Sequence, residues 1–174
     1  LCVAVGNALL YNHRCRRFSR LDGLTMLLNR TQYEKDLERI KPPAVIINMD
    51  VDDFKQINDT RGHAAGDYYL RQIAEVIRTV YGRHGDCYRY GGDEFSLILT
   101  KNLHQMEKLN GMFEAALGQL REQDPQMPMV SLGYALYEGG IEALYATIEK
   151  ADAMMYRNKK VNDRAEIVEN AAEI

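Results

Sequence analysis

The chain has 174 residues, which corresponds to one domain or to one domain with a short extension. Its 46% of hydrophobic residues supply enough apolar surface for a packed core and exclude wholesale disorder. The 22 basic and 25 acidic side chains leave a net charge of −3, which argues against a polynucleotide partner. Three widely spaced cysteines without a C-x-x-C motif argue against a disulfide framework or a zinc site and favour a reducing, cytoplasmic setting.

The first twenty residues have the spacing of an amphipathic helix. Apolar residues between Leu1 and Leu9 fall near one face, and a basic cluster follows between Arg14 and Arg20. Two interpretations stay open: a helix that packs on its own domain, and the end of a signalling linker that pairs with a second copy. A spanning helix needs about 20 apolar residues, so no membrane segment is expected in this chain. The start at Leu suggests a fragment, with a linker helix stub over 1–20 and a domain over 21–174.

The rest of the chain mixes helices and strands without strict alternation. Apolar residues at intervals of three and four predict helices over 67–80, 104–123 and 141–160, and a capping box at Thr31 and Glu34 predicts another over 31–40. Strands are predicted over 44–50, 87–90, 95–100 and 129–137, with a last short strand over 165–168. The segment 50–66 is polar and rich in turn residues. These elements predict an α+β fold in which helices flank a central, mostly antiparallel β-sheet of about five strands.

Acidic residues gather at two points beside predicted strands. The run Asp50-Val-Asp-Asp53 ends the first strand, and Asp93 and Glu94 lie in the turn of a hairpin. Carboxylates beside a buried strand are costly unless something neutralises them, and Mg²⁺ binds carboxylate, carbonyl and phosphate oxygens. Two acids on neighbouring strands that hold a metal are the arrangement used for in-line attack at phosphorus. A solvated strand end and an ordinary acidic turn would explain the same residues, so both interpretations stay open.

Two further features are compatible with phosphate chemistry. Gly91 and Gly92 precede the second acidic point, where glycine permits a close approach of backbone to a ligand or a tight turn with positive φ. Asp53-Phe54-Lys55 follows a strand directly, where exposed backbone N–H groups and the Lys55 ammonium can hold phosphates. Each feature by itself is more often structural.

Residues 89–95 (RYGGDEF) resemble the signature of the GGDEF family, the bacterial diguanylate cyclases. Further segments resemble other motifs of that family in the same order: 22–30 (DGLTMLLNR), 50–59 (DVDDFKQIND), 62–70 (GHAAGDYYL), 131–133 (SLG) and 151–159 (ADAMMYRNK). The resemblance covers about residues 20–165 and implies a fold similar to nucleotidyl cyclase and polymerase palm domains. It also implies that two GTP molecules are condensed into cyclic di-GMP, with release of two pyrophosphates.

The resemblance implies a role for each matching residue. Mg²⁺, or Mn²⁺, would be held by Asp50, the backbone carbonyl of Val51, and Asp93. The catalytic residues would be Asp93, Glu94 and Lys55, and which of the two acids takes the proton from the attacking hydroxyl stays open.

The same resemblance implies a set of GTP-binding residues. The β- and γ-phosphates would be held by Asp53, Phe54 and Lys55, with Lys159 reaching them from the last helix. Asn58 and Asp67 would bind the guanine edge, because a carboxylate accepts hydrogen bonds from N1–H and the exocyclic amine that adenine lacks. His63 belongs near the substrate by its motif, although a structural role is the competing interpretation.

The stoichiometry implies a homodimer, since each chain holds one guanine site and the product contains two. The expected setting is the output domain of a larger signalling protein, controlled by an upstream sensor domain in cis. We expect a cytoplasmic location, either free or as the cytoplasmic part of a membrane-anchored protein. Two other functions stay open: a non-catalytic module that binds GTP or a cyclic dinucleotide, and a cyclase that also accepts ATP.

The sequence departs from the family pattern at three places. Arg83-His-Gly-Asp86 has the residue types of the family's inhibitory R-x-x-D motif, but four residues instead of five separate it from the glycines. A product-binding inhibitory site at Arg83 and Asp86 and a solvated loop therefore both stay open. Lys159 is followed by Lys160-Val-Asn-Asp-Arg164 where the family usually has x-x-Gly-Arg-Asn, so Lys160 or Arg164 would have to replace the arginine. Met26 stands where glycine is frequent.

Overall fold

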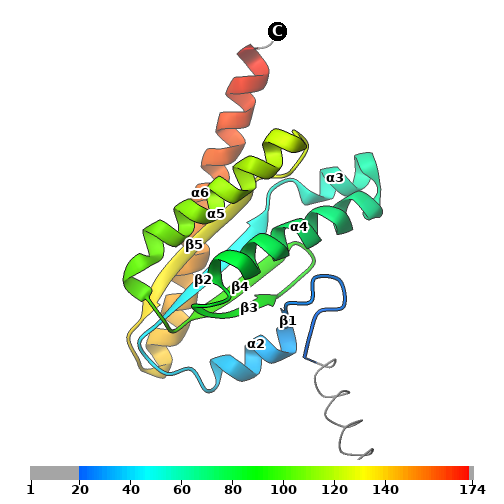
Figure 1. The fold of residues 1–174 in the computed structure, drawn as a ribbon. Coiled ribbons are helices and arrows are strands. Elements are labelled where there is room, and N and C mark those ends of the chain that lie inside the picture. The colour runs from blue at the N-terminus through cyan, green and yellow to red at the C-terminus, as the bar shows by residue number, and fades with distance from the viewer. Residues whose placement is uncertain (1–19, 173–174) are drawn as a thin grey trace, which may run out of the picture.

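The computed structural model describes residues 20–172, so the helix expected over 1–20 lies outside the described residues except for Arg20. Within them a five-stranded sheet has the order β1-β3-β4-β2-β5 (Figure 1). Its strands are β1 (Leu28–Asn29), β2 (Ala44–Val51), β3 (Gly85–Arg89), β4 (Glu94–Leu99) and β5 (Val130–Tyr137). Only the β1–β3 pair is parallel, which confirms the expected mostly antiparallel sheet.

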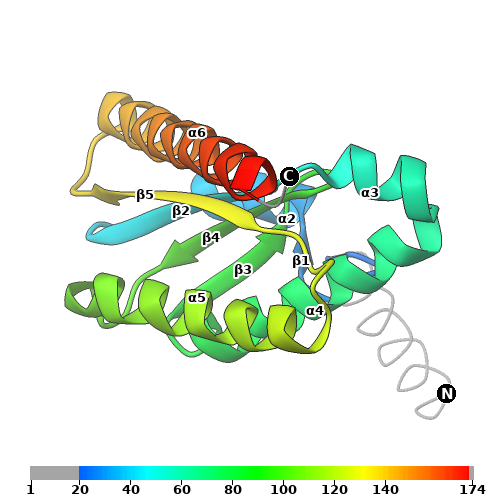
Figure 2. The same cartoon turned by 90° about the horizontal axis from the view of Figure 1, so that it is seen from above.

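Helices cover both faces of this sheet. They are α2 (Arg30–Leu37), α3 (Phe54–Arg61), α4 (His63–Tyr81), α5 (Met106–Gln123) and α6 (Ile141–Ala172), with a short 3₁₀ turn at Leu103–Gln105. Figure 2 shows α4 and α5 on one side of the sheet and α6 on the other. No helix in the described part of the chain is both long and apolar enough to cross a membrane.

The alternation of side chains along β2 explains why Asp50 does not point into the main core. Val45, Ile47, Met49 and Val51 belong to the main core with the apolar faces of α4 and α5. Because successive strand residues point to opposite faces, Asn48 and Asp50 face the other layer. There Asn48 donates a hydrogen bond of 2.6 Å to Asp152 of α6. The mostly apolar run 44–50 therefore contains two polar residues, Asn48 and Asp50, that face α6.

The helix boundaries differ from the prediction at two places. The first described helix begins at Arg30, because the side chain of Asn29, rather than Thr31, accepts the cap hydrogen bond from the N–H of Gln32, and it ends at Leu37. The segment 50–66, which is polar and rich in turn residues and for which no helix was predicted, contains the whole of α3 and the first turn of α4. No residue of α3 is fully buried, and only Phe54 and Ile57 pack against the core, so its apolar pattern is too short to predict a helix. Gly62, with φ +81°, joins α3 to α4.

The last predicted strand, over 165–168, is wrong. Helix α6 runs without interruption from Ile141 to Ala172 and includes those residues. The segment 141–172 contains neither glycine nor proline, the two residue types that most often end a helix. Without such a stop the helix continues, and it extends beyond the rest of the fold in Figure 1.

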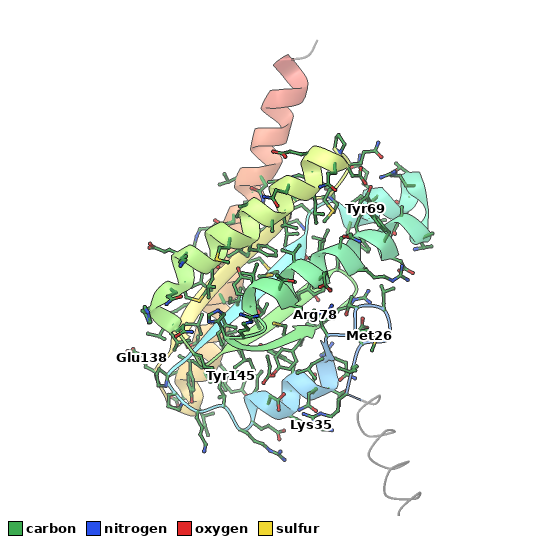
Figure 3. The ribbon with its side chains drawn as sticks, viewed as in Figure 1. Met26, Lys35, Tyr69, Arg78, Glu138 and Tyr145 are labelled. Atoms are coloured by element: carbon green, nitrogen blue, oxygen red, sulfur yellow. The ribbon has the colours of Figure 1, made fainter. Side chains whose placement is uncertain are left out.

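Met26 adopts the backbone conformation that favours glycine. Its φ is +60°, and it lies half-exposed on the loop before β1 (Figure 3). A left-handed conformation costs a non-glycine residue about 1–2 kcal/mol. We therefore expect Met26→Gly to raise the free energy of unfolding by about 0.5–1 kcal/mol, after the greater flexibility of glycine in the unfolded chain is subtracted. Urea unfolding checks this, with Met26→Ala as the control that keeps the strain. Equal stability of the glycine and alanine variants would contradict the explanation.

Candidate active site

Three acidic side chains meet where β2 ends beside the β3–β4 turn. In the antiparallel β2–β4 pair, Asp50 lies opposite Glu94. The N–H of Val51 donates to the carbonyl of Asp93 at 3.2 Å, which places the turn against the strand end. The two acidic points of the sequence are therefore one cluster, formed by the register of two strands.

The acids of this cluster influence one another. Burial raises the pKa of Asp93, and the charge of Asp50 raises it further. The pKa of Glu94 is raised by burial and by the charges of Asp50 and Asp93. Like charges held together at a partly buried edge favour the binding of a cation.

Lys159 of α6 supplies one positive charge at this edge. Its ammonium forms an ion pair with Asp50, a residue 109 positions earlier in the chain. Burial alone would lower the pKa of Lys159, but the hydrogen bond and the charge of Asp50 outweigh it and raise the pKa. Two residues expected to bind different groups, a metal ion and a phosphate, thus contact each other directly.

The oxygen donors at this edge fit a magnesium ion that binds together with phosphate. Among the described residues there is no group of three or more His, Cys, Asp or Glu side chains arranged to hold a metal. Mg²⁺, however, commonly binds proteins through one or two carboxylates and completes its octahedron with waters and substrate phosphates. Asp50 and Asp93 supply the carboxylates that such a magnesium site needs. They do not supply the larger set of protein ligands that a zinc site needs.

The glycine turn leaves room for Glu94. A Cβ atom on Gly91 would lie 2.4 Å from Oε2 of Glu94, whereas one on Gly92 would meet nothing within 4 Å. Neither glycine has a positive φ, so a left-handed turn is not the reason for the pair. The turn is held by Arg89, whose Nη2 donates to the carbonyl of Gly92 at 2.7 Å and whose Nη1 pairs with Asp22 at 3.1 Å. Arg89 thereby links the turn to the segment 22–30.

The predicted phosphate loop forms the start of α3. Asp53 has φ +52° and precedes Phe54, the first residue of the helix, without a side-chain cap. The first N–H groups of a helix lack partners within the helix and attract anions. Asp53 and Lys55 are exposed, so this end of α3 is open to a ligand.

The two predicted guanine ligands belong to neighbouring helices. Asn58 of α3 lies against Gly66 of α4, where a Cβ would come within 2.2 Å of Oδ1 of Asn58. That Oδ1 atom is buried and has no hydrogen-bond partner in the described structure. Asp67 follows Gly66 directly and is half-buried, and His63 is exposed in the first turn of α4. The α3–α4 hairpin therefore groups these three residues at one place.

The candidate inhibitory residues lie apart from the acidic cluster. Arg83 is exposed in the turn after α4, and Asp86 lies in β3 opposite Ile98, four residues along β4 from Glu94. Among the described residues no ion pair joins Arg83 to Asp86. The structure brings Asp93 and Glu94 together with Asp50 but does not join Arg83 to Asp86.

A polar network that was not predicted from the sequence lies next to the acids along the same two strands. Ser96 Oγ donates to Oδ1 of Asn48 at 3.0 Å, and Asn48 in turn donates to Asp152. Asn48 precedes Asp50 by two residues, and Ser96 follows Glu94 by two, so the network ties the same two strands to α6. A polar residue inside an otherwise apolar strand was the available signal. Asp52, in contrast, is buried with 6% exposure, and its Oδ2 accepts hydrogen bonds from Ser131 and Asn162.

Comparisons with known proteins identify the family of this chain. The family model described as "Diguanylate cyclase, GGDEF domain" matches residues 19–164. Diguanylate cyclase DgcS of Shewanella oneidensis is 32% identical over 162 residues, covering 88% of this chain and 53% of that protein. Diguanylate cyclase DosC of Escherichia coli is 29% identical over 163 residues, covering 87% of this chain and 35% of that protein. The chain thus spans about half of the first relative and about a third of the second.

A solved structure has the same fold over nearly the whole chain. The coiled coil and GGDEF domain of DgcB from Caulobacter crescentus, in complex with c-di-GMP, superposes with a TM-score of 0.78 at 27% identity. The match covers 91% of this chain and 90% of that one. Since the family model matches well over half of the sequence, the chain belongs to the diguanylate cyclase GGDEF-domain family.

Proposed function

We propose that this chain is a diguanylate cyclase, which condenses two GTP into cyclic di-GMP and releases two pyrophosphates. The observation that carries the proposal is the register that sets Asp50 opposite Glu94 and Asp93 against Val51, close to the open start of α3. The family membership and the relatives named diguanylate cyclase support the same reaction.

The acidic cluster is the proposed site of the divalent cation. Asp50, the backbone carbonyl of Val51, and Asp93 would hold Mg²⁺ or Mn²⁺. When bound, the cation neutralises charge that develops on the triphosphate during attack at the α-phosphate. Asp93 and Glu94 both have raised pKa values, through burial first and Asp50 second, and a raised pKa makes either carboxylate a stronger base toward the attacking hydroxyl.

The remaining side chains would orient GTP. The free N–H groups at Asp53, Phe54 and Lys55 would bind the β- and γ-phosphates, and Lys159 would exchange its partner Asp50 for a phosphate oxygen. Asn58 and Asp67 would bind the guanine edge, with His63 at the rim of the same hairpin.

The product requires two chains. Each would hold one GTP, and the 3′-hydroxyl of each nucleotide would attack the α-phosphate of the other, forming two phosphodiester bonds as two P–O bonds to pyrophosphate break. A two-fold homodimer matches the two-fold symmetry of the product. Since the curated relatives are longer, we propose that the chain serves as the cytoplasmic output domain of a signalling protein whose sensor lies elsewhere in the same polypeptide.

Incubation with GTP and Mg²⁺, followed by chromatography and mass spectrometry, tests the proposal. We expect cyclic di-GMP and pyrophosphate, a specific activity that rises with protein concentration because the active species is a dimer, and no product with EDTA or with ATP alone. Binding of GTP without product at high protein concentration would instead identify a non-catalytic binding module. Full specific activity in a monomer at low concentration would contradict the dimer.

The contact between Gly66 and Asn58 gives a prediction about GTP affinity. In Gly66→Ala the new Cβ would overlap Oδ1 of Asn58 and push that amide out of position. We expect KM for GTP to rise about five- to tenfold, as for the loss of one hydrogen bond, while the fold stays stable because alanine favours helix. Gly111→Ala in α5 is the control, since nothing lies within 4 Å of its Cβ. An unchanged KM in Gly66→Ala would contradict the assignment of Asn58.

A further inference from the structure

Asn162 occupies the position at which the GGDEF family usually has a glycine, three residues after its last lysine. In this chain α6 passes through Asn162 and continues to Ala172. Asn162 follows Lys159 by three residues, so the two side chains lie on neighbouring positions of one helix face. The side chain that replaces the glycine is therefore close to the lysine that pairs with Asp50.

The amide of Asn162 makes two hydrogen bonds across the structure. Its Nδ2 donates to Oδ2 of Asp52 at 2.9 Å and to Oγ of Ser131 at 3.0 Å. Ser131 Oγ also donates to the same Asp52 oxygen at 2.9 Å. Asp52 and Ser131 are 6% and 1% exposed, so these bonds are shielded from water, where hydrogen bonds to a charged group are worth most.

These three residues surround the same strand end as the acidic cluster. Asp52 follows Asp50 by two residues, and Ser131 of β5 lies opposite Asp50 in the β2–β5 register. Along α6, one turn separates the Asn162 contact from the Lys159–Asp50 ion pair. A displacement of α6 at Asn162 would therefore move the Lys159 ammonium relative to Asp50.

We propose that Asn162 is a positioning residue: its hydrogen bonds to Asp52 and Ser131 fix α6 so that the Lys159 ammonium is directed at the carboxylate of Asp50. Its effect on GTP rests on the proposed function, in which Lys159 binds a phosphate. The side-chain hydrogen bonds of Asn162 go to Asp52 and Ser131 and not to Asp50 or Lys159, so Asn162 acts through the helix. Asn158, which donates to the carbonyl of Leu132 at 2.7 Å, holds the preceding turn and lets α6 remain folded when Asn162 is changed.

Four variants of the full chain test this inference. Asn162→Ala removes both hydrogen bonds, and Asn162→Asp places a second carboxylate against Asp52. The double variant Asp52→Asn with Asn162→Asp exchanges the two residues. An amide then again faces a carboxylate, and the net charge is unchanged. Val161→Ala, at a side chain with 63% exposure, is the matched control in the same helical turn.

Two readouts separate positioning from general stability. We expect Asn162→Ala to speed amide hydrogen exchange in segment 155–162 about tenfold and to raise KM for GTP about tenfold, with kcat changed less than about twofold. We expect larger effects in Asn162→Asp and recovery of most of both values in the exchange variant. Val161→Ala should match the unaltered chain.

The inference is overturned if Asn162→Ala behaves like Val161→Ala in both readouts, or if the exchange variant recovers neither. If the unaltered chain forms no cyclic di-GMP, the proposed function fails, and hydrogen exchange alone then decides whether Asn162 holds α6. The two failures are therefore distinguishable.

Discussion

Replacing Asp93 with alanine is expected to reduce cyclic di-GMP formation at least about 10³-fold while the fold remains intact. Asp93 is one of two carboxylates proposed to bind Mg²⁺, and its loss removes charge stabilisation at the reacting phosphate. The side chain lies at the sheet edge rather than in the core, so its removal leaves the packing unchanged. Product formation at saturating GTP and Mg²⁺, with circular dichroism for the fold, measures both expectations.

The control for this experiment is Glu122→Gln, which changes an exposed acid of α5 far along the chain from the cluster. It should leave activity and fold unchanged. Wild-type rates in Asp93→Ala would reject the metal assignment, and loss of the folded spectrum would reject the claim that Asp93 serves chemistry instead of structure.

The raised pKa of Asp93 adds a pH dependence with a definite sign. Its pKa is raised in the folded state by burial first and by Asp50 second, so the folded state binds this proton more tightly than the unfolded state. Without metal, the stability contributed by Asp93 is therefore present at low pH and is lost as pH rises through the folded pKa. Asp93→Asn should be more stable than the unaltered chain at pH 8, and the difference should shrink as pH falls toward 4. Thermal unfolding in EDTA checks the direction.

Gly133→Ala is expected to lower the free energy of unfolding by about 3 kcal/mol, at the upper end of overpacking effects. A Cβ on Gly133 would lie 2.1 Å from the carbonyl oxygen of Ala151 and 2.2 Å from the backbone nitrogen of Met155. Backbone atoms of α6 cannot rotate away as a side chain can, so the whole helix must move off β5. Activity should fall as well, because α6 carries Lys159.

Urea unfolding with Gly118→Ala as control checks this prediction. A Cβ added at Gly118 would meet nothing within 4 Å, so alanine there should preserve or raise stability. Equal stability of Gly133→Ala and the unaltered chain would show that α6 does not approach β5 as closely as the structure has it.

Periodicity in the sequence predicted the long elements because their burial is regular. The helix over 67–80 and the strand over 44–50 have apolar residues at the spacing that their cores require, and both lie within the observed α4 and β2. Helix α3 has no fully buried residue, and its two apolar residues that pack on the core, Phe54 and Ile57, are too few to form a recognisable helical pattern. The error at 165–168 has a similar origin, since a short apolar run cannot distinguish a strand from a continued helix.

The candidate site was likewise predicted only in part from the sequence. The six ordered motifs located Asp50, Asp93 and the phosphate loop by their positions in the chain, and the register confirms that the two acidic points adjoin. The motifs did not indicate that Asp52 is buried, although it stands between two residues proposed to face the substrate. They also did not indicate that Lys159 pairs with Asp50 across the fold.

By itself the sequence determined the types of the long elements, the mostly antiparallel α+β class and the residues available for phosphate chemistry, because these follow from local spacing and residue chemistry. The tertiary structure decided which of those residues meet. Strand register set Glu94 opposite Asp50, and the packing of α6 on Gly133 brought Lys159 to the same edge. Contacts of this kind depend on the relative placement of elements far apart in the chain, and no short-range pattern encodes that placement.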